Sequence, residues 1–120
     1  MENSELTWHA RAIYMLIIIF MLLANIVFGQ IKVVQFNAGW NKANDVPWVM
    51  SLKDCKTISY TDVASDKKAQ TKYKIASVPT IIIFKDGEEV ARFQADLSFT
   101  LAATKEEVQE EIDNQLMSDF

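Results

Sequence analysis

The strongest constraint on the fold is a run of four apolar residues at positions 81–84, with the sequence Ile-Ile-Ile-Phe. The run is too short for a buried helix, and its β-branched residues favour a strand covered on both faces. Asp86 and Gly87 then supply the positive φ angles of a tight two-residue hairpin, and residues 90–95 return to extended alternation. We therefore expect a central strand paired antiparallel with the strand that follows it.

Two further strands and a helix are predicted around this hairpin. Residues 31–36 and 58–63 are rich in β-forming side chains and are separated by a helix-length stretch, which is the pattern of a parallel βαβ crossover. Thr104 and Glu107 have the spacing of a capping box. Val108, Ile112 and Leu116 then recur every four residues, so one stripe of the last helix should face the sheet.

Several of these segments resemble the thioredoxin family. Residues 40–44, Trp-Asn-Lys-Ala-Asn, have the position and spacing of its W-C-G-P-C motif, and residues 60–63, Tyr-Thr-Asp-Val, resemble its V-D-V-D strand end. Residues 72–80 are similar to its K-Y-G-I-R-G-I-P-T stretch, and residues 81–88 to its L-L-L-F-K-N-G-E strand and turn. The resemblance covers residues 30–116. The family's first strand and helix have no counterpart.

This resemblance implies an α/β fold with two parts. Residues 30–120 are expected to form a minimal thioredoxin-like, three-layer α/β/α domain with a mixed four-stranded sheet. Residues 1–29 are expected to form an N-terminal tail and a hydrophobic helix, which would span a membrane, act as a signal anchor or be buried in an assembly.

The resemblance also indicates that the family's catalytic residues are absent. Asn41 and Asn44 stand in place of its two cysteines, and Gln35 stands where the family has a buried aspartate. Dithiol exchange needs a low-pKa thiolate and a second, resolving thiol. The helix start is also expected to be displaced, because Asp45 followed by Pro47 predicts an N-cap with proline in the first turn, downstream of Asn41. No catalytic residue and no cofactor are therefore expected.

The same region supplies the candidate binding residues. In the family, the peptide bond before the proline equivalent to Pro79 is cis, and this proline faces the motif. The resemblance implies that the backbone of Val78 is free to pair with an extended peptide. The alternative is that Pro79 does no more than set the direction of the strand at residue 81. Trp40 could line the groove, whereas Trp48 is expected in the core. The other motif residues, read without the family, form a polar loop that caps the helix: Asn41, Lys42 and Asn44.

Two other features have competing interpretations. Cys55 is the only cysteine, and nearby Lys53 and Lys56 would lower its pKa. It lies far in sequence from the motif, so a structural role is expected, with an intermolecular disulfide or a reactive thiol as the alternatives. Residues 96–101 alternate polar with apolar side chains and could form an extra edge strand for a partner.

The N-terminal apolar stretch, residues 12–28, is about seventeen residues long without a charge, which is the lower limit for crossing a bilayer. Small or neutral residues at 27–29, ahead of Gln30, suit signal-peptide cleavage. The preceding tail carries Glu2 and Glu5 against Arg11 alone, whereas a signal peptide has a positive start. We therefore expect a retained, uncleaved helix, with secretion after cleavage as the alternative.

The expected partners follow from this stretch. Residues 13–28 would contact a membrane or the apolar helices of other subunits in a large assembly. Arg11 on one side is balanced by Lys32 and Lys42 on the other, so charge does not fix the orientation. By analogy with tethered thioredoxin-like domains, we expect the folded domain outside the cytoplasm.

Composition argues against several functions. The net charge is −4, and Lys and Arg are scattered rather than gathered into a stripe, which argues against a nucleic-acid surface. There is no Gly-rich phosphate loop. The single histidine, His9, and the single cysteine give no metal-ligand cluster.

The sequence therefore predicts a redox-inactive thioredoxin-like interaction or structural module, tethered by its N-terminal helix, with protein partners that include an extended peptide at the cis-proline groove. Two alternatives remain open. One is a structural subunit of a large assembly, such as a virion or a membrane complex. The other is a single-cysteine thiol oxidoreductase that uses Cys55.

Overall fold

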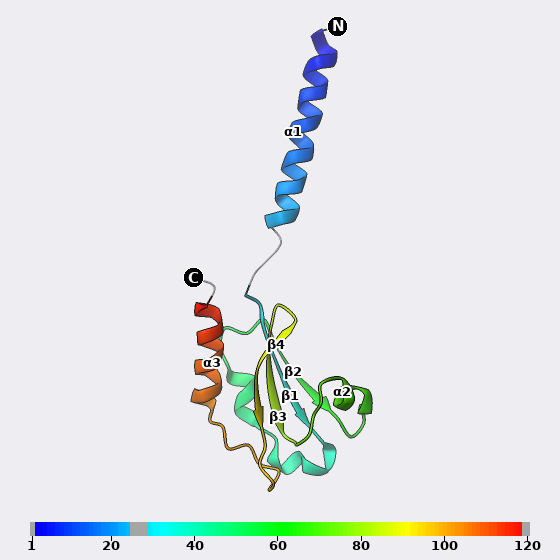
Figure 1. Cartoon of the computed structure of the whole chain (residues 1–120). Coiled ribbons are helices and arrows are strands. Elements are labelled where there is room, and N and C mark those ends of the chain that lie inside the picture. The colour runs from blue at the N-terminus through cyan, green and yellow to red at the C-terminus, as the bar shows by residue number, and fades with distance from the viewer. Residues whose placement is uncertain (1, 25–28, 119–120) are drawn as a thin grey trace.

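The computed structural model describes residues 2–24 and 29–118 (Figure 1). Within these ranges a helix, α1 (Glu2–Ala24), precedes a four-stranded sheet with further helices. The predicted α/β domain with a mixed sheet is confirmed.

The sheet has the strand order β2-β1-β3-β4. Its strands are β1 (Ile31–Asn37), β2 (Thr57–Asp62), β3 (Thr80–Lys85) and β4 (Glu88–Gln94). β1 pairs parallel with β2 and antiparallel with β3, and β3 pairs antiparallel with β4. The predicted crossover and hairpin are therefore both present, and the apolar run at residues 81–84 is completely buried in an inner strand.

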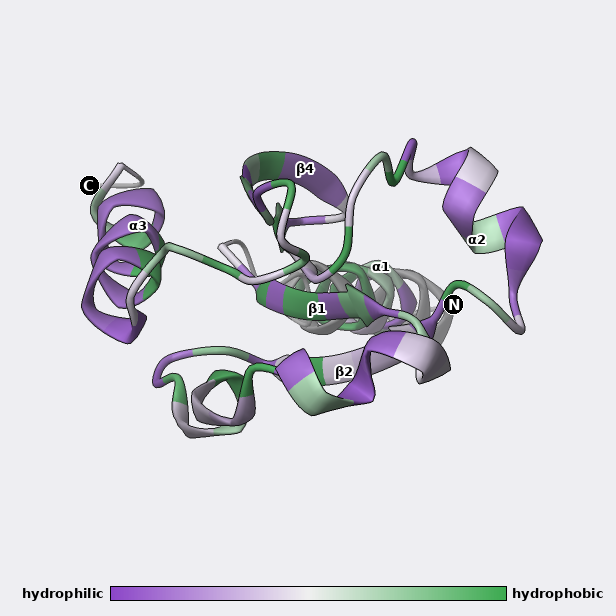
Figure 2. Cartoon of the chain, turned by 90° about the horizontal axis from the view of Figure 1, so that it is seen from below, coloured by the Kyte–Doolittle hydropathy of each residue, from purple (hydrophilic) through white to green (hydrophobic). Residues whose placement is uncertain are grey.

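Two apolar clusters cover the two faces of this sheet, because successive side chains of a strand point to opposite sides. Figure 2 shows α3 (Lys105–Met117) and α2 (Lys67–Lys72) on opposite sides of the strands. One cluster includes Val108 and Ile112 of α3, and the other is packed by Tyr73, just after α2. From β1, the first cluster takes Ile31 and Val33 and the second takes Val34 and Phe36.

The β1–β2 connection differs from the predicted helix. It contains two short 3-10 helices, η1 (Gly39–Asn44) and η2 (Pro47–Ser51). Val46, not Asp45, precedes η2, and its side chain makes no capping bond. Asp45 is instead the acceptor for Asn37 Nδ2 and for the Tyr60 hydroxyl. Because Pro47 lacks an N–H group, an α-helix cannot run through from η1, which explains the short turns.

The hairpin and the last helix form as predicted. Asp86 and Gly87 have φ angles of 52° and 87°. The Asp86 carboxylate also accepts hydrogen bonds from the backbone N–H groups of Gly29 and Gln30, which fixes the start of the domain to the hairpin. At the start of α3, Thr104 Oγ1 accepts from the N–H of Glu107. The buried stripe of α3 then packs on the sheet.

The predicted edge strand at residues 96–101 is wrong. The segment forms a turn in which Phe99 N–H donates to the Asp96 carbonyl and Asp96 N–H to the Thr100 carbonyl. Hydrogen bonds from Ser98 to the Asp96 carboxylate close the turn and lower the pKa of Asp96. Polar side chains that bond to their own backbone compete with strand formation, and alternation alone does not reveal this.

The N-terminal helix exposes its apolar side chains. Every residue from 9 to 20 is exposed, including Ile13, Leu16 and Phe20, which is 73% exposed. Over the residues that the structure describes, no helix is long and apolar enough to cross a membrane. The predicted span, residues 12–28, ends in residues 25–28, which lie outside the described residues, so the membrane-spanning prediction is not confirmed.

Candidate functional site

The candidate site lies where β1 ends and β3 begins. The antiparallel register places Phe36 opposite Thr80, so η1, after β1, meets the residues that lead into β3. The Val78–Pro79 peptide bond is cis, as expected from the family resemblance. The motif loop and the proline segment are therefore neighbours, as predicted.

The centre of this site is the side chain of Asn41, which is only 5% exposed. Its Nδ2 donates to Asn37 Oδ1 at 3.1 Å, to the carbonyl of Phe99 at 3.1 Å and to the carbonyl of Val78 at 3.3 Å. Its Oδ1 accepts from Asn44 Nδ2 at 2.8 Å. The first cysteine position of the motif thus holds a buried amide that joins three segments of the chain.

The interpretation of residues 41–44 as a polar loop that caps a helix is wrong for this reason. Asn41 lies within η1, and its side chain bonds to β1, the proline segment and the turn at residues 96–100. Asn44 is half-buried and supports Asn41, whereas Lys42 is exposed. The two asparagines contribute to folding, while Lys42 remains available at the surface.

The backbone of Val78 is less available than the family resemblance implied. Its carbonyl already accepts a hydrogen bond from Asn41, so one of its two lone pairs is used within the chain. Buried polar groups usually have a partner, and here the chain itself supplies it.

The exposed part of the site is an aromatic pair. Trp40 is 65% exposed, and its ring meets the ring of Phe99 edge-on, with the centroids 5.2 Å apart and the planes at 88°. Phe99 has a φ of 62°, a left-handed conformation that costs energy for a residue with a bulky side chain. The carbonyl bond to Asn41 and the contact with Trp40 hold it there.

A small groove of about 150 Å³ lies beside this pair. One of its lining residues, Ser77, has a buried Oγ atom with no hydrogen-bond partner. The groove is lined by Ala38, Trp40, Val63, Ala64, Gln70, Ile75, Ala76, Ser77, Val78 and Phe99. It is a small hollow with both polar and apolar lining.

Gln35, at the position of the family's buried acid, has a structural role. It is 5% exposed, its Oε1 accepts from the N–H of Val46 at 2.8 Å, and its Nε2 donates to the Val46 carbonyl at 3.2 Å. A carboxylate has no proton to donate and could not make both bonds. The residue therefore fixes the segment between the two 3-10 helices.

Cys55 is separated from this site by the length of β1. It lies beside Lys56, whose N–H donates to the carbonyl of Ile31 at the start of that strand. Burial, followed by the charges of Asp54 and Asp113, raises the pKa of Cys55 to about 11. The prediction that Lys53 and Lys56 would lower this pKa is wrong, because burial and the acidic neighbours outweigh them.

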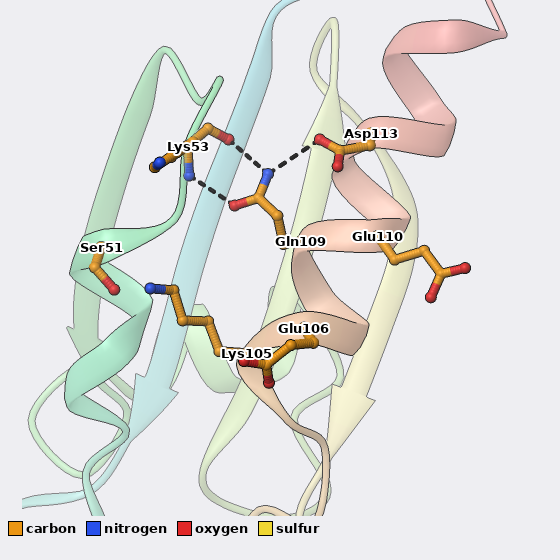
Figure 3. Close-up of a pocket in the computed structure, with 7 residues that line it drawn as sticks. All are labelled: Ser51, Lys53, Lys105, Glu106, Gln109, Glu110 and Asp113. Atoms are coloured by element: carbon orange, nitrogen blue, oxygen red, sulfur yellow. Dashed lines mark hydrogen bonds between the residues drawn. The ribbon is translucent and has the colours of Figure 1, made fainter.

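A second hollow, between η2 and α3, is charged (Figure 3). The amide of Gln109 crosses it, accepting from the N–H of Lys53 at 2.8 Å and donating to its carbonyl at 3.0 Å. Gln109 also donates to Asp113 at 3.1 Å. Gln109 therefore connects the loop before β2 to α3. Trp48, in η2, packs against the core cluster that includes Val108 and Ile112, as predicted.

A metal centre is not formed by the residues described. Within 2–24 and 29–118, no group of three or more His, Cys, Asp or Glu side chains has a geometry that could hold an ion.

Sequence reasoning missed two members of the site. Asn37, completely buried at the end of β1, donates to the carbonyl of Asn41 and accepts from its side chain. Phe99 covers the groove. For Asn37, the available signal was its spacing from Asn41, since both are polar and lie next to a buried strand. No local sequence pattern indicates that Phe99 belongs to the site.

The sheet order, the cis peptide bond before Pro79 and the loop beside it define a thioredoxin-like fold, and comparison with solved structures agrees. The chain is similar to a substituted thioredoxin from Halobacterium salinarum, with 20% identity and a TM-score of 0.60, covering 73% of this chain and 76% of that one. It is also similar to the thioredoxin of Fasciola hepatica, with 29% identity and a TM-score of 0.55, covering 73% of this chain and 83% of that one.

Sequence comparison gives a shorter match. A segment of 36 residues is 44% identical to thioredoxins of Chlamydia trachomatis and Chlamydia pneumoniae. It spans 30% of this chain and only 35% of those relatives. No family model matches the chain.

Proposed function

We propose that this chain is a redox-inactive, thioredoxin-like interaction or structural module. The observation that carries the proposal is the bonding of Asn41, which fills the first cysteine position with a buried amide bonded to Asn37, Val78 and Phe99. A residue held in this way stabilises the loop, and an amide cannot act as the nucleophile of thiol exchange.

The surroundings of Asn41 support the same proposal. Gln35 uses both ends of its amide on Val46 and has no carboxylate with which to move protons. The motif lies on a 3-10 helix of six residues rather than at the start of a long α-helix, whose dipole stabilises a thiolate. The loop therefore lacks both the chemical groups and the helix start on which the family's reaction depends.

We further propose that the exposed site is a surface for binding protein. Trp40 offers a large, exposed aromatic ring, of the kind enriched at interfaces, next to the groove at Ser77. An extended peptide segment would place a side chain in the groove, beside the ring of Trp40. The Val78 carbonyl already accepts from Asn41, which leaves one of its two lone pairs for such a peptide.

The N-terminal helix supplies the proposed tether. Eight consecutive large apolar side chains, residues 13–20, are exposed. At 3.6 residues per turn they surround the helix completely. Burying a large apolar side chain contributes about 1.5–3 kcal/mol, so this segment has a strong tendency to bury itself in lipid or against other chains. Vesicle flotation of the full chain, with Ile17→Asp as the control, distinguishes lipid from a protein assembly.

The alternative function is a thiol oxidoreductase that uses Cys55. Its pKa of about 11 leaves roughly 10⁻⁴ of the thiol ionised at pH 7. The test is thiol–disulfide exchange with a small disulfide substrate, comparing the full chain with Cys55→Ser. We expect no catalytic turnover in either. Turnover in the natural chain that disappears in Cys55→Ser would instead establish the oxidoreductase.

A further inference from the structure

The two edges of the sheet differ in how they are protected from pairing with other chains. β4 carries the charged residues Glu88, Glu89 and Arg92, and its pairing with β3 is irregular near Phe84. β2 has no charge from residue 57 to 61, and its sequence there is Thr-Ile-Ser-Tyr-Thr. Charges and bulges are common protections of an edge strand, and an edge without them is a template for pairing.

The outward backbone groups of β2 can be assigned from its pairing with β1. The N–H of Val63, just after the end of this strand, donates to the carbonyl of Asn37 at 2.9 Å, and Asn37 pairs with Asp62 in the parallel register. Backbone groups alternate sides along a strand. Thr57, Ser59 and Thr61 therefore point their N–H and C=O groups towards β1. Ile58, Tyr60 and Asp62 point theirs away from the sheet, on the side where the described part of the chain has no further strand.

The sequence around Ser59 is self-complementary. In an antiparallel pair of two copies centred on Ser59, Ile58 lies opposite Tyr60, which matches the outward backbone groups as hydrogen-bonded pairs. Ile58 and Tyr60 are also a β-branched and aromatic pair, which stabilises strands. Thr57 lies opposite Thr61 as a non-hydrogen-bonded pair. Lys56 lies opposite Asp62, and two-fold symmetry makes this oppositely charged pair occur twice.

Other registers lose this match. A slip of one residue opposes outward groups with inward groups, so the hydrogen bonds cannot form. A slip of two residues separates Lys56 from Asp62, and in one direction it places Asp62 opposite Asp54. The charges that flank the neutral strand thus select one register.

We propose that β2 pairs antiparallel with β2 of a second copy of this chain, about a two-fold axis at Ser59. The two sheets join into one of eight strands, with the order β4-β3-β1-β2-β2-β1-β3-β4. Sheets of up to about ten strands are common. The proposal does not depend on the redox state of the motif, because its residues lie on the outer side of a different strand.

Cysteine cross-linking of the full chain tests the register. The experiment uses the Cys55→Ser background in detergent micelles that cover the apolar part of α1, with a mild oxidant. The two Ser59 residues would form a non-hydrogen-bonded pair, whose Cα atoms lie about 4.5 Å apart, which suits a disulfide. Ser59→Cys is therefore expected to give a disulfide-linked dimer.

The controls are on the same strand. In the proposed register each Thr57 lies about 14 Å along the strand from its own copy. Thr57→Cys alone and Thr61→Cys alone should therefore cross-link at least tenfold less than Ser59→Cys. An equimolar mixture of Thr57→Cys and Thr61→Cys should form the mixed dimer. Equal cross-linking at all three positions, or none at Ser59→Cys, would overturn the proposal.

Charge exchange gives an independent readout. Adding Lys56→Asp to the Ser59→Cys chain should slow cross-linking by roughly two- to thirtyfold, since two exposed ion pairs are lost. Adding Asp62→Lys to that variant should restore the rate. No slowing with Lys56→Asp, or no recovery in the double exchange while its circular dichroism remains native, would contradict the register.

Discussion

The side-chain amide of Asn41 donates a hydrogen bond to the carbonyl of Val78, across 37 positions of the sequence. This bond joins the degenerate motif to the cis-proline segment, and a third acceptor, Phe99, adds the turn before α3. Asn41, which the family resemblance aligns with the first cysteine, is therefore part of the framework that holds the site together.

Replacing Asn41 with alanine is therefore expected to destabilise the domain. The carbonyls of Val78 and Phe99 would lose their shared donor in a buried place, at a cost of about 1–3 kcal/mol. Urea unfolding followed by tryptophan fluorescence measures this cost. Lys42→Ala is the matched control because Lys42 is exposed on the same turn, and it should change stability by less than about 0.5 kcal/mol. Equal effects of the two variants would contradict the role of Asn41.

Gln109→Ala should also destabilise the chain, by about 1–2 kcal/mol. Its amide makes two hydrogen bonds to the backbone of Lys53, and their loss releases the loop before β2 from α3. The neighbouring exposed residue gives the control, Glu110→Ala, for which we expect little change. Hydrogen exchange at Lys53 N–H, measured by NMR, should rise only in the Gln109 variant; unchanged protection there would refute the proposed connection.

The reactivity of Cys55 should depend on pH as expected for a pKa of about 11. Iodoacetamide reacts with the thiolate, so the rate should still rise above pH 10, whereas an ordinary thiol levels off near pH 9. Asp113→Asn removes one of the charges that raise the pKa and should shift the profile to lower pH. A profile that levels off near pH 9, as for an ordinary thiol, would contradict the raised pKa.

The raised pKa of Cys55 also predicts how the free energy of unfolding changes with pH. The folded chain holds the Cys55 proton more tightly than the unfolded chain, whose thiol has a pKa near 9.0. Between about pH 9 and 11 the folded state therefore binds more protons, and stability falls as pH rises through this window. Cys55→Ser lacks this contribution, so its stability should fall less over the same range; parallel curves for the two chains would contradict the linkage.

The sequence predicted the parts of the fold that local patterns determine. The apolar run at residues 81–84, the positive φ angles at Asp86 and Gly87 and the stripe of Val108 and Ile112 all follow from periodicity or turn chemistry. The cis bond before Pro79 followed from resemblance to a family, since no local pattern requires it.

The remainder depended on contacts between distant residues. Residues 41–44 were predicted to be a polar loop that caps the helix, because nothing in residues 40–44 indicates that Asn41 would find acceptors at Val78 and Phe99. The pKa of Cys55 was misjudged for the same reason: its lysine neighbours are visible in the sequence, while Asp113 approaches through the fold.

The central claim is that the motif has lost its chemistry at several levels, and restoring the thiols tests it most directly. In the double variant Asn41→Cys, Asn44→Cys, Gln35 still occupies Val46 with its amide and the motif still lies on a short 3-10 helix. Insulin reduction by this variant, measured against each single variant, should not exceed their rates by more than a few fold. A rate close to that of an ordinary thioredoxin would show that only the cysteines had been lost, and would contradict the account.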